Sequence, residues 1–246
     1  MLRHCGLPSF LFATNQKNRK EFFENVMNVK KYSKKEAIKI VSECAKKYQE
    51  YLEEKVLLIV YQNTNTKDVG CIELHFHARN FLHLTGFKLR EKFLTENEAD
   101  SRAKNFYKKC LDHKLSTEDF DFSTDGTTHL KLMILPSLLC PNLNAKMIGK
   151  FSNGKPKLFT DRLAGNTKGA IGFIKDKTTH TFLPNTVVSE DVRNLIDPVD
   201  RVIAIFIKNE GDIKFLKPTY IAKKVDWDDI KIDEKYVYLL ELCEAN

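Results

Sequence analysis

The sequence predicts an α+β fold in which helices, mostly in the first half of the chain, pack on a largely antiparallel sheet. Two observations lead to this prediction. Apolar residues recur at helical spacing over residues 34–54 and 99–111. From residue 146 onward, short apolar runs alternate with glycines and polar turns, which is typical of strands. With 246 residues, of which 42% are hydrophobic, the chain can bury a core of its own.

Capping residues mark where the two long helices begin. Ser33 and Glu36 form a capping box that opens the first helix, and Thr95 with Glu98 opens the second. Two further segments are shorter: residues 80–86, a helical turn closed by glycine, and residues 130–139, which fit either a helix or a strand and contain a proline break.

Eight runs are typical of strands: 56–61, 71–77, 146–151, 158–163, 170–174, 181–188, 201–208 and 220–225. The run Arg201–Lys208 (RVIAIFIK) is the clearest buried strand. Because only a strand covered on both faces, or nearly so, needs such an unbroken apolar run, we expect it at the centre of the sheet. One of its faces should be covered by the helix over 34–54 or by the helix over 99–113.

Composition excludes several classes of protein. No run approaches 18 uncharged apolar residues, so we expect no membrane span. The six cysteines are scattered and form no CxxC pair, which favours reduced thiols in a cytosol over a zinc ribbon or a disulfide scaffold. The apolar stretch near the N-terminus lacks a small-x-small cleavage site, so we expect a cytoplasmic protein without a signal peptide.

Charge is unevenly distributed along the chain. Residues 226–246 contain seven acidic residues and two lysines, a net charge of −5, so residues 1–225 carry +12. A body this basic suits a polyanion, although a lysine-rich surface that only aids solubility is the alternative. We expect the acidic tail to fold back over part of the basic body and to limit access to the polyanion site, docking through its apolar residues Trp227, Tyr236, Tyr238, Leu239 and Leu240. An acidic tail that only aids solubility is the alternative.

The densest polar cluster contains three histidines and an arginine. His75 and His77 share one face of a predicted strand, and Arg79 and His83 follow. These groups could transfer protons and neutralise a phosphate, as metal-free RNA cleavage requires. A zinc site that includes Cys71 is the alternative, but the spacing matches no common zinc pattern, so we expect no metal. A solvated strand face and a hydrogen-bonded core histidine would also explain the cluster.

Two polar loops in the second half are further candidates. The loop Gly165–Gly169 (GNTKG) carries Asn166 and Lys168, which could cradle a phosphate, although a plain hairpin turn explains its glycines equally well. Asn185 and Thr186 could orient a substrate, although turn chemistry also explains a Pro-Asn pair.

Several segments taken together resemble one nuclease family. They are NFLHLTG (80–86), TDRLAGN (160–166), Gly172-Phe173, PNT (184–186) with DVR (191–193), and DRVIAIFIK (200–208). In this order they resemble the phage and prophage nuclease domains grouped with barnase, EndoU, the colicin tRNases and RelE, in particular the fourth subfamily. The resemblance covers residues 34–225, which leaves 1–33 as an N-terminal extension and 226–246 as an acidic C-terminal tail.

This resemblance implies a fold of N-terminal helices packed on four or five mostly antiparallel strands, with the active site on the open face of the sheet. It also implies cleavage of RNA without a metal, in which the ribose 2′-OH attacks the adjacent phosphate. The catalytic residues we predict are His83, Asn185, Thr186, Arg193 and Lys208. The predicted substrate-binding residues are His75, His77, Arg79, Lys88, Asn166 and Lys168, with no cofactor.

The sequence therefore predicts a metal-independent endoribonuclease, a toxin or effector of a phage, prophage or other mobile element. Its expected partners are RNA and a protein antitoxin or immunity protein, and it is not expected to bind a membrane. A non-catalytic module of the same fold that binds nucleic acid or a nucleotide is the alternative, and a structural or interaction protein is a third.

Overall fold

The structure is a computed structural model that describes residues 30–90, 95–152 and 158–244. Contacts between residues separate Met1–Lys31 from Tyr32–Asn246, and every element named below belongs to the second of these units. Nearly all of the predicted N-terminal extension lies outside the described residues.

Five α-helices lie in the described residues: α2 (Lys34–Tyr51), α3 (Phe81–Thr85), α4 (Glu96–Leu111), α5 (Thr127–Leu138) and α6 (Tyr238–Glu244). Both predicted capping boxes are present, at Ser33 and at Thr95. The ambiguous apolar run forms α5, with Pro136 in its last turn. None of the helices in this part of the chain combines the length and the apolar character needed to cross a bilayer.

Each of the eight strand-like runs of the sequence overlaps a strand of one sheet. These strands are β1 (Lys55–Gln62), β2 (Val69–Phe76), β5 (Met147–Lys150), β6 (Arg162–Gly165), β7 (Ala170–Lys175), β8 (Phe182–Val188), β9 (Asp200–Asn209) and β10 (Lys217–Ile221). The runs 158–163 and 220–225, however, share only two residues each with β6 and β10, whose bounds are shifted along the chain. Their order is β1-β2-β8-β7-β6-β5-β9-β10. The short strands β3 (Lys88–Leu89) and β4 (Phe120–Asp121) form a separate pair.

The α+β class is therefore confirmed, but the expected number of four or five strands is wrong. The sheet has eight strands because β1 and β2, from the first half of the chain, join the strands of the second half. β1 also pairs with β9, so the first seven strands in the order close into a ring of pairings and β10 lies outside it. The strands of the ring are largely buried, and the backbone N–H and C=O groups of a buried strand need partners on both of its edges. Closing the strands into a ring provides those partners.

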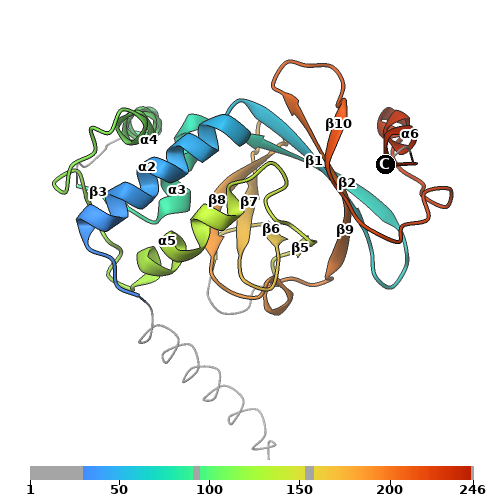
Figure 1. Cartoon of the computed structure of the whole chain (residues 1–246), viewed down its shortest axis with the longest axis horizontal. Coiled ribbons are helices and arrows are strands. Elements are labelled where there is room, and N and C mark those ends of the chain that lie inside the picture. Colours follow the sequence, from blue (N-terminus) through green and yellow to red (C-terminus); the bar gives the residue numbers. More distant parts are fainter. Residues whose placement is uncertain (1–29, 91–94, 153–157, 245–246) are drawn as a thin grey trace, which may run out of the picture. The chain divides into compact units, whose positions relative to one another are not determined.

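The prediction that residues 201–208 form a central strand is confirmed. β9 pairs with β1, β5 and β10. Along one face, Val202 and Ile205 belong to the main hydrophobic cluster, which also contains Val41 and Tyr48 of α2. The main cluster is thus closed on one side by helices and on the other by strands. Figure 1 shows α2, α3, α4 and α5 gathered on the same side of the strands.

The opposite face of β9 is covered by the C-terminal tail. Ile203 and Phe206 form a second cluster with Tyr236 and Leu239, which are almost fully buried. Trp227, Tyr238 and Leu240 pack at the margin of this cluster. Figure 1 shows α6 beside β10, at the end of the sheet away from the other helices. The tail therefore docks through the apolar residues expected from the sequence, and it completes a hydrophobic core.

The burial of Leu239 in this cluster leads to a prediction about the free energy of unfolding. Leu239 is 1% exposed, so Leu239→Ala should lower the free energy of unfolding by about 2–5 kcal/mol, because it removes apolar contact and leaves a cavity. Val237→Ala is the matched control, since Val237 is 49% exposed and its truncation should change stability by less than about 0.5 kcal/mol. Chemical denaturation of the full chain measures both values, and equal small losses would contradict the assignment of the tail to the core.

Candidate active site

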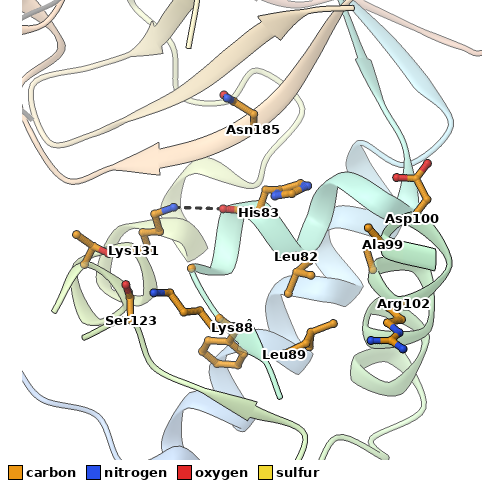
Figure 2. A pocket seen from close by; sticks show the side chains of 14 residues that line it. Leu82, His83, Lys88, Leu89, Ala99, Asp100, Arg102, Ser123, Lys131 and Asn185 are labelled. Atoms are coloured by element: carbon orange, nitrogen blue, oxygen red, sulfur yellow. Dashed lines mark hydrogen bonds between the residues drawn. The ribbon is translucent and has the colours of Figure 1, made fainter. Parts of the chain in front are cut away.

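A cavity of about 480 Å³ lies where α3, α4 and α5 meet β3 and β8 (Figure 2). Its lining consists of Leu82, His83, Gly86, Phe87, Lys88, Leu89, Ala99, Asp100, Arg102, Ala103, Ser123, Thr127, Lys131 and Asn185. The resemblance implied a site on the open face of the sheet, whereas this cavity lies on the side that carries the helices. The opposite face is covered over β1 and β9 by the tail, and over β6 and β7 by Val192, Leu195 and Ile196.

His83 is presented to the cavity by the short helix α3. Phe81 and Leu84 are fully buried and hold this helix against the core, so the exposed side chain of His83 lies on its outer side. The surrounding protein lowers the pKa of His83 below its usual value of about 6.5, and the ammonium of Lys131 lowers it further. The carboxylate of Asp100 opposes this shift. The neutral imidazole, which can accept a proton, is therefore favoured at neutral pH.

Lys131 of α5 connects two of the elements around the cavity. Its Nζ donates to the backbone oxygen of His83 at 3.2 Å and to Oγ1 of Thr186 in β8 at 3.0 Å (Figure 2 draws the first of these bonds). Burial lowers the pKa of Lys131 to about 8, although the nearby Asp125 acts in the opposite direction. A lysine with this pKa is mostly protonated at pH 7 and still releases its proton readily.

Gly86 allows Lys131 to reach these partners. It ends α3 in the left-handed conformation, with φ of 74°. A Cβ atom at this position would lie 2.8 Å from Cδ of Lys131. Any other residue would therefore strain the backbone and also push the lysine side chain away from its present path.

Asn185 and Thr186 approach the cavity from β8. Gly172 of β7 leaves room for Thr186 and for Thr160, because a Cβ atom there would lie 2.6 Å from Cγ2 of Thr186 and 2.8 Å from Oγ1 of Thr160. Two hydrogen bonds fix the orientation of the Asn185 side-chain amide. Its nitrogen donates to the backbone oxygen of Phe159, and its oxygen accepts from Oγ1 of Thr160 at 3.2 Å. The predicted residues His83, Asn185 and Thr186 are thus brought together.

The cavity has a cationic rim that the sequence revealed only in part. Lys88 was expected to bind substrate and lines the cavity, and Arg102 and Lys131 join it. Asp100 is the carboxylate among the described lining residues, and it binds Nη1 of Arg79 at 2.9 Å. Arg79 therefore contacts a lining residue without lining the cavity itself. The sequence does not single out Lys131, although it is the one charged residue in the apolar run 130–139. That position marks an unusual residue but does not reveal its partners.

His75 of β2 and His77, which directly follows this strand, lie in another cluster. Their Nδ1 atoms are each 3.7 Å from a carboxylate oxygen of Glu210, and Nε2 of His75 is 3.7 Å from Glu73. The hydroxyl of Tyr236 in the tail donates a hydrogen bond to the carboxylate of Glu73. The pKa of Glu73 is lowered to about 2, mainly by its hydrogen bond with His75. No group of three or more potential ligand side chains in the described segments is arranged to hold a metal ion.

Four other predicted residues do not line the cavity. Arg193 binds Asp191 through Nε at 3.0 Å and Nη2 at 2.6 Å. Lys208 donates to the backbone oxygen of Asp212 at 2.8 Å. Asn166 and Lys168 lie in a tight turn between β6 and β7, in which the Asn166 side chain accepts from the backbone N–H of Lys168. The interpretation of this loop as a plain hairpin turn therefore matches its hydrogen bonds.

A cavity that combines a neutral imidazole, a protonated lysine and further cations is typical of proteins that act on phosphate esters. Comparison with known protein families leads to the same class of protein. The family model described as phage-Barnase-EndoU-ColicinE5/D-RelE like nuclease4 matches residues 40–224, and the chain belongs to this nuclease family. The resemblance noted in the sequence is thereby confirmed. Searches of curated proteins and of solved structures found no significant match.

The electrostatic coupling in the cavity can be measured directly. Lys131→Gln removes a positive charge that disfavours protonated His83, so the pKa of His83 should rise. Titration of the imidazole signals by NMR measures this shift. Lys88→Gln is the control, because Lys88 lines the same cavity but is not among the charges that depress this pKa. Equal shifts in both variants, or a fall in Lys131→Gln, would contradict the coupling.

Proposed function

We propose that the cavity cleaves RNA without a metal ion, with His83 and Lys131 as the acid–base pair. The observation that carries this proposal is the position of His83 beside Lys131 in one cation-lined cavity, where Nζ of Lys131 lies 3.2 Å from the backbone oxygen of His83. The surrounding protein lowers the pKa of both groups, which suits them to proton transfer near neutral pH. Membership of a nuclease family supplies the reaction class, which is cleavage of a phosphodiester.

The proposed reaction is an internal transfer at phosphorus. Neutral His83 accepts the proton of the ribose 2′-OH, and the 2′-oxygen forms a bond to the adjacent phosphorus. The bond from phosphorus to the 5′-oxygen breaks, and Lys131 gives its proton to that oxygen. The products are a 2′,3′-cyclic phosphate and a 5′-hydroxyl end, with His83 protonated and Lys131 neutral.

The remaining polar groups would bind and stabilise the substrate. Lys88 and Arg102 offset the charge that accumulates on the phosphorane oxygens, which is the largest electrostatic demand of the reaction. Asn185 and Thr186 position the substrate through the oriented amide and hydroxyl described above. We leave Arg193 and Lys208 out of the catalytic set, because local acceptors bind them outside the cavity.

The biological role we propose is that of a toxin or effector of a phage, prophage or other mobile element, acting in the cytoplasm and restrained by a protein antitoxin or immunity partner. The phage origin named in the family description supports this role. The competing proposal is a non-catalytic module that binds nucleic acid or a nucleotide in the same cavity.

Substitution separates these two proposals. His83→Ala and Lys131→Ala should each reduce RNA cleavage by about a hundredfold or more while keeping the melting temperature, because each removes one proton-transfer group. Lys208→Ala and Arg193→Ala should retain most activity, which tests whether catalysis belongs to the cavity. Cleavage of labelled RNA in the presence of EDTA measures all four variants. Full inhibition by EDTA would contradict metal independence, and no cleavage of any RNA by folded wild type would favour the binding module.

The pH dependence of cleavage provides a second test. The rate should rise as His83 loses its proton, with a midpoint below about pH 6.5, and should fall as Lys131 loses its proton near pH 8. Lys131→Arg should lower the maximal rate but remove the fall near pH 8, because a guanidinium stays protonated there. Measurement of kcat/KM from pH 5 to 10 gives both profiles. An unchanged alkaline limb in Lys131→Arg would exclude Lys131 as the acid.

A further inference from the structure

The floor of the cavity differs chemically from its rim. Leu82 of α3, Leu89 of β3 and Ala99 and Ala103 of α4 form an apolar surface. Figure 2 shows Leu82 and Leu89 between the lysines on one side and the α4 residues on the other. A phosphate gains nothing from such a surface, because an anion needs hydrogen-bond donors or cations. The cavity therefore has two parts that suit two different portions of one ligand.

Packed aromatic rings support the floor. Phe87 lines it, and its ring stacks on Phe120 with centroids 3.9 Å apart and an interplanar angle of 0°. The same ring meets Phe106 of α4 edge to face at 5.9 Å. Packed aromatic rings of this kind fix the width of the cavity before a ligand enters, which lowers the entropy lost on binding.

Size and polar groups favour a nucleobase on this floor. At about 480 Å³, the cavity lies in the range of roughly 300–1,000 Å³ that holds small organic ligands, and it exceeds the needs of a phosphate. Ser123 and Thr127 lie at its edge, and the Thr127 hydroxyl donates to Asp125 at 2.7 Å. Their oxygens keep the capacity to accept a hydrogen bond from the edge of a base.

We propose that the floor formed by Leu82, Leu89, Ala99 and Ala103 is a nucleobase subsite, which holds the base next to the phosphate bound at the cationic rim. The inference rests on the proposed function, because it assigns the rim to that phosphate. A base in this subsite cannot remain paired and stacked in a duplex, so the substrate class is single-stranded nucleic acid.

Binding of small probes tests the subsite without cleavage. The four nucleoside 3′-monophosphates and inorganic phosphate are titrated into the full chain, and affinities are measured by calorimetry. At least one nucleotide should bind tenfold or more tightly than phosphate. In NMR spectra of the protein, this nucleotide should change the chemical shifts of backbone amides in α3, β3 and α4. A 2′-O-methyl single strand should also bind at least tenfold more tightly than the corresponding duplex. Equal affinity of all four nucleotides and phosphate, or of strand and duplex, would overturn the proposal.

Filling the floor gives a matched comparison. Ala99→Phe places a ring in the cavity and should reduce nucleotide affinity tenfold or more without changing phosphate affinity. Ser101→Phe introduces the same ring on an exposed position of α4 outside the cavity lining, and it should change neither affinity. Ala99→Leu serves if Ala99→Phe does not fold, as judged by its melting temperature. Equal nucleotide affinity in folded Ala99 and Ser101 variants would overturn the subsite.

The outcomes also separate this inference from the proposed function. If the wild-type protein binds nucleotides but cleaves no RNA, and if Ala99→Phe loses the nucleotide binding, then the subsite stands and the catalytic proposal fails. If Ala99→Phe cleaves RNA and binds nucleotides as wild type does, the catalytic proposal stands and the subsite fails.

Discussion

The pairing of β9 with three other strands is the constraint on which the rest of the structure depends. β9 pairs with β1 along nearly its whole length and with β5 at its first residues, and these two ladders close the ring of strands. Its two faces contribute to different hydrophobic clusters, one shared with the helices and the other with the tail. The position of β8, which carries Asn185 and Thr186, follows from this closure through β5, β6 and β7.

Local elements of the fold could be predicted from the sequence, because their signals lie within a few residues of each other. The capping boxes at Ser33 and Thr95 and the glycine that ends α3 are such signals. The ring of strands could not be predicted, since Val56 and its partner Lys208 are separated by most of the chain. Apolar patterning identifies a strand but does not specify its neighbours.

The candidate site was predictable to a similar degree. His83, Asn185 and Thr186 were recognised as polar residues in a distinctive order, and the structure brings them together. Arg193 is bound instead by the carboxylate of Asp191, two residues away, and this acidic neighbour is visible in the sequence. Lys208 is bound by the backbone oxygen of Asp212, four residues away, and a backbone acceptor leaves no mark in the sequence. The contribution of Lys131 depends on burial and on two partners from distant elements, which no local pattern encodes.

The tail has a consequence for how the family varies. The family match ends at residue 224, yet Tyr236, Leu239 and Cys243 complete a hydrophobic cluster with Leu58 and Phe206. A relative without an equivalent of this segment would expose the positions of Leu58 and Phe206 to water, at a cost of about 1.5–3 kcal/mol for each. Such relatives are therefore expected to carry polar side chains there, so that the residues on this face of the sheet covary with the presence or absence of a C-terminal cover.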